Sequence, residues 1–166
     1  MKPAVNILIA DDEVNIREAL VTMLGKKGHQ VRGVATAEEG LEHLETTPAD
    51  LVITDLRMPG IGGIEFLRRL KDTWPDTEVV VMTAYGSIDT AVEAMRYGAY
   101  DYLTKPIDRV RFPIVVDKAL ERHVLATENK QLRDRLETST RFDQITGESE
   151  PMQRIYGPAD MVADRL

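Results

Sequence analysis

Short apolar runs alternate with amphipathic stretches along the first 125 residues of the chain. The apolar runs lie at 5–10, 31–34, 51–54, 78–82 and 100–103, and their length and β-branched residues predict strands. Between them, apolar residues recur at helical spacing, and Thr36 with Glu39 three residues later predicts a helix start. Gly28 is expected to end the first helix. This alternation predicts an α/β fold, a doubly wound parallel sheet with helices on both faces.

The fourth and fifth helices are expected to pack on this sheet through apolar stripes. Ser87 is predicted to cap the fourth helix, and Gly98 to end it. Its apolar face is predicted to consist of Ile88, Ala91, Val92 and Met95. The fifth helix is expected to start near Asp108 and to face the core with Val115, Val116, Ala119, Leu120 and Val124.

Beyond residue 124 the pattern of the fifth helix changes. Its apolar positions thin out to Leu125, Leu132 and Leu136, and Asn129 completes a 4-3-4 spacing. This spacing is typical of a two-stranded coiled coil in which a polar asparagine sets the register. Because the seam covers little more than two heptads, a single solvated helix is the alternative. We predict a globular domain at 1–124 and an extended, coiled-coil-like dimerisation linker at 125–141.

Composition and charge narrow the function classes only slightly. The formal net charge of −7 argues against nonspecific binding of nucleic acid by this chain, because such binding depends on neutralising phosphates. The chain has no cysteine, which excludes disulfides and thiolate metal sites. The N-terminus lacks the features of a signal peptide, and no stretch approaches the ~18 apolar residues of a membrane span. We therefore expect a cytoplasmic protein that does not bind membranes.

Candidate chemistry lies where the predicted strands end. Asp11 and Asp12 follow the first strand, Asp55 and Thr83 follow the third and fourth, and Lys105 follows the fifth. Because ligands of parallel α/β sheets bind at the carboxyl ends of the strands, these side chains are expected to meet. A carboxylate can accept a phosphoryl group, a neighbouring acidic pair suits Mg²⁺, and a hydroxyl and an ammonium can bind phosphate oxygens. The pattern predicts a phosphoryl-transfer site.

These motifs resemble the receiver domain of bacterial two-component response regulators over roughly residues 4 to 125. The residues that carry the resemblance are Asp11-Asp12, Asp55-Leu56-Arg57-Met58-Pro59, Met82-Thr83-Ala84 and Lys105-Pro106. The resemblance implies a flavodoxin-like sheet of order 2-1-3-4-5. It also implies that a sensor histidine kinase transfers a phosphoryl group to Asp55, and that Thr83 and Lys105 contact this group.

The resemblance further implies a Mg²⁺ cofactor. Its ligands would be the side chains of Asp12 and Asp55 and the backbone carbonyl of Arg57, with Asp11 acting largely through water. Arg57 and Tyr85 lie beside the site and are expected to influence hydrolysis of the acyl phosphate. The domain would be a phosphoacceptor and not an enzyme, because its only reactions are its own phosphoryl transfer and dephosphorylation.

The resemblance also identifies a switch. Thr83 would swing to the phosphate, and the ring of Tyr102 would change its packing. This change would reshape the face formed by the fourth helix, the fifth strand and the fifth helix, and thereby alter homodimerisation through the linker. The Lys105–Pro106 bond is expected to be cis by the same resemblance, although only ~5–6% of X–Pro bonds in folded proteins are.

Within receivers, segments 83–87 and 98–103 are similar to the nitrogen-regulation class of sigma-54-dependent transcription activators. Residues 145–152 resemble the opening of the ATPase domain of those activators, so 142–166 is expected to begin such a domain, truncated and too short to fold alone. The sequence leaves open whether this segment is ordered. No phosphate-binding loop or helix-turn-helix motif is present. We therefore expect the ATPase and DNA-binding domains of a longer protein as partners.

Two other functions have lower support. A stand-alone receiver without transcription output would need no linker beyond residue 124 and no ATPase-like tail. A magnesium-dependent phosphatase of the haloacid-dehalogenase type would carry a general acid two residues after the nucleophile, where this chain has Arg57. It would also need a substrate cap, and none is evident.

Overall fold

The computed structural model describes residues 5–84 and 88–149, with side chains as far as residue 138. The chain divides into two compact units, Met1–Leu125 and Ala126–Leu166. None of the helices in the described ranges offers an apolar stretch that would span a bilayer. The elements alternate as predicted: β1 (Asn6–Ala10), α1 (Val14–Gly25), β2 (Gln30–Val34), α2 (Ala37–Thr46), β3 (Leu51–Asp55), α3 (Gly62–Thr73), β4 (Glu78–Thr83), α4 (Ile88–Arg96), β5 (Asp101–Thr104) and α5 (Arg111–Ser149).

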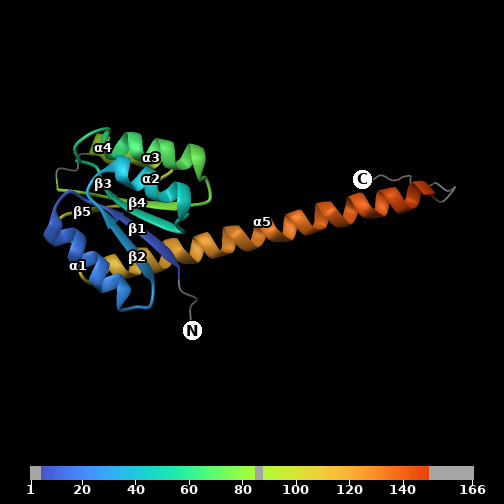
Figure 1. The fold of residues 1–166 in the computed structure, drawn as a ribbon, viewed down its shortest axis with the longest axis horizontal. Coiled ribbons are helices and arrows are strands. Elements are labelled where there is room, and N and C mark those ends of the chain that lie inside the picture. Colours follow the sequence, from blue (N-terminus) through green and yellow to red (C-terminus); the bar gives the residue numbers. More distant parts are fainter. Residues whose placement is uncertain (1–4, 85–87, 150–166) are drawn as a thin grey trace. The chain divides into compact units, whose positions relative to one another are not determined.

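All five strands lie parallel in one sheet of order β2-β1-β3-β4-β5, which confirms the predicted fold. Figure 1 shows α1 and the start of α5 on one face of this sheet, and α2, α3 and α4 on the other. The direction in which the chain adds strands reverses at β1, which lies between β2 and β3. In such sheets the ligand site lies beyond the carboxyl ends of the strands at this point.

Two apolar layers form the core, one on each face of the sheet. β3 and β4 are buried at every position, as expected for inner strands covered on both faces. Phe66 of α3 fills one layer and Phe112 of α5 fills the other, and both side chains are fully buried. The second layer also contains most of the predicted stripe of α5, namely Val115, Val116, Ala119 and Leu120. The first turns of α5 therefore belong to the core of the first unit.

The helix boundaries confirm one predicted signal and correct another. Thr36 caps α2, because its Oγ1 accepts a hydrogen bond from the N–H of Glu39 at 3.1 Å. The predicted end of α1 at Gly28 is wrong, since the helix ends at Gly25. Gly28 lies in the turn that follows, with a φ of +93° that glycine adopts without strain. Gly28 therefore allows the turn between α1 and β2 and does not end the helix.

The predicted apolar face of α4 is wrong at most positions. Ala91 is buried, but Ile88, Val92 and Met95 are 82%, 50% and 45% exposed. The second buried residue of this helix is Ala94, so α4 packs through a stripe of small side chains. The larger apolar residues lie beside this stripe and remain in contact with solvent. Ser87, the predicted cap, lies outside the described residues.

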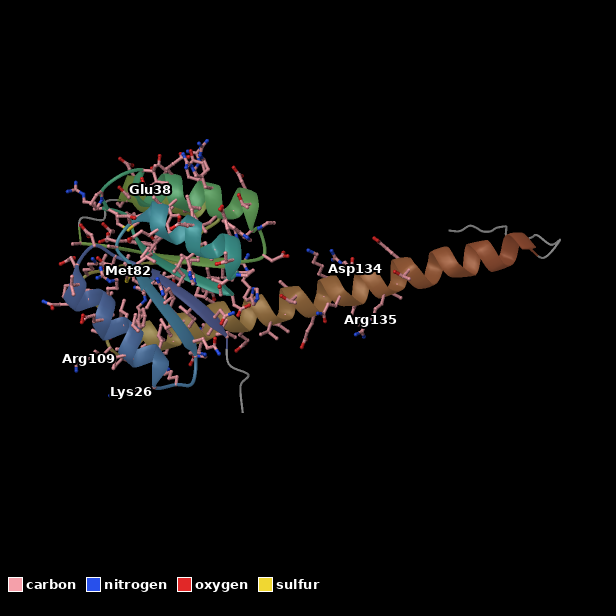
Figure 2. All side chains as sticks on the ribbon, in the orientation of Figure 1. Lys26, Glu38, Met82, Arg109, Asp134 and Arg135 are labelled. Carbon is pink, nitrogen blue, oxygen red and sulfur yellow. The ribbon has the colours of Figure 1, made fainter. Side chains whose placement is uncertain are left out.

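The second unit is described as the continuation of α5 to Ser149. Leu132 and Leu136, two of the predicted coiled-coil positions, are 56% and 68% exposed. Figure 2 shows Asp134 and Arg135 projecting from this part of the helix, and both are exposed. An exposed leucine stripe on a charged helix is the surface that a coiled-coil partner would cover.

Candidate functional site

The carboxyl ends of four strands carry the predicted site residues to one edge of the sheet. Asp55 is the last residue of β3 and Thr83 the last of β4, while Asp11 follows β1 and Lys105 follows β5. The N–H of Lys105 donates to the carbonyl of Thr83 at 3.0 Å, which holds β5 beside β4 at this end. Asp11, Asp55 and Thr83 are buried, and Asp12 is exposed. Among the predicted site residues, two acidic groups are therefore buried and one is open to solvent.

The ammonium of Lys105 lies among three carboxylates. Its Nζ is 2.7 Å from Asp55 Oδ2, 2.8 Å from Glu13 Oε1 and 2.9 Å from Asp11 Oδ2, and the lysine side chain is only 5% exposed. Burial alone would lower the pKa of Lys105, but the hydrogen bonds to the acidic groups outweigh it and raise this pKa. Lys105 therefore stays charged across the physiological range and neutralises part of the acidic edge.

Asp11 retains one oxygen that could hold a cation. Its Oδ1 accepts a hydrogen bond from the N–H of Glu13 at 2.9 Å. Its buried Oδ2 forms an ion pair with the ammonium of Lys105 at 2.9 Å and meets no other donor. Burial raises the pKa of Asp11, and the hydrogen bond from Glu13 and the charge of Lys105 only partly offset this. Adding a positive charge at this oxygen would stabilise the ionised form.

The three carboxylates among the four predicted metal-site residues fit a hard divalent cation. Carboxylate oxygens of Asp11, Asp12 and Asp55 lie within 4.8 Å of one another. Mg²⁺ prefers oxygen ligands and keeps several waters, so two carboxylates and a carbonyl from the protein are sufficient. The donor set, the buried oxygen of Asp11 and the excess of negative charge are all consistent with such a site.

The loop after β3 fixes the carboxylate of Asp55. Its Oδ1 accepts a hydrogen bond from the N–H of Arg57 at 3.0 Å, so the two oxygens of this carboxylate have different partners. α3 begins unusually close to the end of β3, and a Cβ at Gly63 would lie 2.5 Å from the Cα of Leu56. Glycine at this position lets the N–H of Gly63 donate to the carbonyl of Leu56 at 3.1 Å. The nucleophile candidate is therefore held on a rigid turn.

The two predicted switch residues lie on neighbouring strands. Thr83 is 2% exposed at the end of β4. Tyr102 is half-buried on β5, and its side chain packs against the apolar layer that contains Phe66. The Lys105–Pro106 bond is cis, which confirms the expectation from the resemblance. Tyr85 lies outside the described residues.

Two contacts of the site were not predicted. Glu13 pairs with Lys105, although its position next to the acidic pair was a signal that a third carboxylate could take part. Arg17 donates a hydrogen bond from Nη1 to the backbone carbonyl of Asp11 at 2.8 Å. This second contact has no sequence signal, because it depends on how α1 lies beside β1.

Comparison with known proteins places this geometry in a family. Residues 7–117 match the response regulator receiver domain. The chain is 36% identical over 148 residues to the response regulator protein PilR of Pseudomonas aeruginosa, covering 89% of this chain and 31% of that protein. It is 35% identical over 149 residues to the regulatory protein AtoC of Escherichia coli, covering 90% and 32%. The chain thus spans about a third of the length of these curated relatives.

Among solved structures, the crystal structure of NtrX from Brucella abortus matches with a TM-score of 0.75 and 35% identity, over 81% of this chain and 30% of that chain. The resemblance to receivers of the nitrogen-regulation class is thereby confirmed. With more than half of its residues matched by the family and its fold shared with solved members, this chain belongs to the response regulator receiver domains.

Proposed function

We propose that Asp55 accepts a phosphoryl group from a phosphohistidine of a sensor kinase. In this step the N–P bond of the donor breaks, and an O–P bond to a carboxylate oxygen of Asp55 forms. The observation that carries the proposal is the position of this carboxylate, which is buried at the end of β3 beside Asp11 and 2.7 Å from Lys105. Catalysis of phosphoryl transfer rests on positioning and on charge stabilisation, and this site offers both.

Each neighbour of Asp55 has a role in this proposal. Asp11, Asp12, Asp55 and the backbone carbonyl of Arg57 would hold Mg²⁺, which supplies positive charge for the transferred phosphoryl group. Lys105 stays protonated and provides a second positive charge, which already lies 2.7 Å from Oδ2 of Asp55 before the phosphoryl group is transferred. The hydroxyl of Thr83 would donate a hydrogen bond to a phosphate oxygen. Because these groups lie at or just after strand ends, the backbone of the site needs little reorganisation when the phosphoryl group arrives.

We further propose that phosphorylation is read out through Thr83 and Tyr102. Movement of Thr83 toward the phosphate would release space into which the Tyr102 ring can repack. The adjoining helix α4 already exposes Ile88, Val92 and Met95, so a small change there alters an apolar surface. Couplings of this kind amount to ~1–3 kcal/mol, enough for a 5–150-fold shift in an equilibrium.

The output that fits this chain is dimerisation through the linker. In this proposal residues 1–124 are the receiver, 125–141 form a two-stranded coiled coil, and 142–166 begin the ATPase domain of a longer sigma-54-dependent activator. Leu125, Leu132 and Leu136 are 60%, 56% and 68% exposed, which supports a partner helix on this stripe. A solved relative at 32% identity and a TM-score of 0.68 is described as the beryllofluoride-activated receiver domain dimer of NtrC4. The DNA-binding and ATPase domains would respond to the state of the dimer.

Phosphoryl acceptance can be tested with a small phosphodonor such as acetyl phosphate and intact-mass spectrometry. The protein is expected to gain one phosphoryl group only with Mg²⁺ present, and Asp55→Asn is expected to gain none. Asp72→Asn, at an exposed position of α3, is the matched control and should be labelled like the wild type. Continued labelling of Asp55→Asn would overturn the assignment of the phosphoacceptor.

Dimerisation can be tested by light scattering with Mg²⁺, with and without beryllofluoride as a mimic of the acyl phosphate. A change in molar mass would support a switch at Asp55, and a mass that stays dimeric would mean that the linker pairs constitutively. Leu132→Glu should give a monomer in both states, whereas Gln131→Glu, at an exposed position on the outer side of the helix, should not. A wild type that is monomeric in both states would refute the coiled-coil linker.

A further inference from the structure

Arg17 connects α1 to the backbone of the acidic edge. The residue lies on the first half of α1 and is half-buried, and its Nη1 donates a hydrogen bond to the carbonyl oxygen of Asp11 at 2.8 Å. The charged guanidinium is the donor and the main-chain carbonyl the acceptor, and a hydrogen bond from a charged donor is stronger than one between neutral groups. The peptide after Asp11 is therefore held from the side of the helix.

A glycine on the edge strand makes room for this arginine. The stem of Arg17 lies over Gly33 of β2, where a Cβ would be 2.9 Å from Cγ and 3.1 Å from Cδ of the arginine. The next residue along β2, Val34, accepts a hydrogen bond from the N–H of Asp11 at 3.0 Å. β2 therefore contacts Asp11 in two ways. Val34 accepts a hydrogen bond from its N–H, and Gly33 leaves space for the Arg17 side chain that binds its carbonyl oxygen.

These contacts fix every polar atom of Asp11 except Oδ2, whose one protein partner is the ammonium of Lys105. The N–H, the carbonyl oxygen and Oδ1 of this residue all have hydrogen-bond partners, contributed by Val34, Arg17 and Glu13. Oδ2 is buried and forms an ion pair with the ammonium of Lys105 at 2.9 Å, and Asp11 lies in the carboxylate cluster with Asp12 and Asp55. We propose that Arg17 is a positioning residue, which fixes the backbone of Asp11 so that Oδ2 stays aimed at the cation site. This inference rests on the proposed function, because it concerns the same metal site.

The sign of the effect separates positioning from simple electrostatics. A guanidinium near an acidic cluster repels a cation, so removing its charge would tighten cation binding if charge alone mattered. If Arg17 positions Asp11, removing it weakens binding instead, because a misaligned ligand loses coordination. Loss of a hydrogen-bond partner behind a metal ligand typically costs 10–100-fold in metal affinity.

The test is a titration with Mn²⁺ as a probe for the magnesium site, in which free Mn²⁺ is measured by electron paramagnetic resonance. Arg17→Met keeps most of the apolar stem and is expected to bind Mn²⁺ about 10-fold more weakly or worse. Arg32→Met is the matched control, since Arg32 is exposed and lines the same surface groove as Arg17 and Gly33. It removes the same charge and should leave the affinity unchanged or slightly higher.

Hydrogen exchange of the metal-free protein gives a second readout. In Arg17→Met the N–H groups of Asp11 and Glu13 are expected to exchange faster, while those of β4 keep their protection. If Arg17→Met does not fold, Gly33→Ala tests the same contact, because the added methyl group displaces the arginine stem and should also weaken Mn²⁺ binding several-fold.

The outcomes are distinguishable. Wild-type affinity or tighter binding in Arg17→Met, or in Gly33→Ala where that variant decides, would overturn the positioning role. If the wild type binds no Mn²⁺, or binds it equally well after Asp55→Asn, the proposed metal site itself fails and the inference fails with it.

Discussion

Replacing His123 is expected to destabilise the domain in acid solution and to have little effect in alkaline solution. This histidine of α5 lies at the amino ends of the strands, opposite the acidic edge. Its Nε2 is 2.9 Å from Oδ1 of Asp50, and its Nδ1 is 2.8 Å from the carbonyl oxygen of Asp76. Both partners are acceptors, so only the protonated ring can donate to both. Glu78 and Arg122 are the nearby charged pair, with their side-chain atoms 3.2 Å apart.

The pH dependence follows from the two pKa shifts. The hydrogen bond to Asp50 raises the pKa of His123, and the same bond lowers the pKa of Asp50. The contribution of His123 is therefore complete below its unfolded pKa of about 6.5, and it is lost as the pH rises through the raised folded value. The contribution of Asp50 is complete above about 3.9, and it is lost as the pH falls through the lowered folded value. The pair therefore contributes its full stability between about pH 3.9 and about pH 6.5.

The expected size is about 1 kcal/mol. A hydrogen bond to a charged group contributes ~1.5–3 kcal/mol when buried, but these side chains are 14% and 33% exposed, so solvent screening reduces the value. A double-mutant cycle of His123→Gln and Asp50→Asn, measured by urea unfolding, isolates the pair. At about pH 5.5 the coupling should shift the urea midpoint by roughly 0.3–1 M, and at about pH 9 it should be close to zero. A coupling of equal size at both pH values would refute this reasoning.

Three further substitutions test the packing and the charge balance. Gly63→Ala should lower the free energy of unfolding by about 1–3 kcal/mol, because the new Cβ meets backbone atoms at the end of β3. Gly25→Ala is the control, since a Cβ there has no neighbour within 4 Å, and an equal loss in both variants would contradict the close approach at Gly63. Lys105→Met without divalent cations should cost about 2 kcal/mol at neutral pH and less in acid, because burial raises the pKa of Asp11 and this carboxylate then takes up a proton. A loss independent of pH would argue against this. Phe112→Ala should lower the free energy of unfolding by about 3–5 kcal/mol, measured by thermal or urea unfolding. Val110→Ala, at a position 74% exposed, should cost far less, and comparable losses would contradict the assignment of Phe112 to the core.

The sequence was informative where short-range pattern and final environment coincide. The uniform apolar runs of β3 and β4 indicate inner strands, and a parallel sheet then brings their last residues, Asp55 and Thr83, to one edge. The acidic pair after β1 joins them by the same rule. The fold and the composition of the candidate site could therefore be predicted from periodicity and from the positions of strand ends.

The features that were wrong or missed depend on tertiary contacts. The spacing on α4 favoured its large apolar residues, but the helix packs through Ala91 and Ala94. The contact from Arg17 to Asp11 and the space that Gly33 provides arise between elements, and a periodic pattern contains no information about them. Long side chains such as Glu13 can reach several partners, and only the folded backbone selects Lys105.

The continuity of α5 has a consequence for fusing this receiver to foreign output domains. A junction placed between Phe112 and Leu120 would replace side chains that fill the sheet-facing layer, so the receiver itself would unfold. A junction after Val124 keeps that layer intact. The number of residues added there then matters, because each one turns whatever follows by about 100° around the helix axis, while seven bring it back to within about 20°. Functional chimeras of this chain should accordingly recur at seven-residue intervals of linker length.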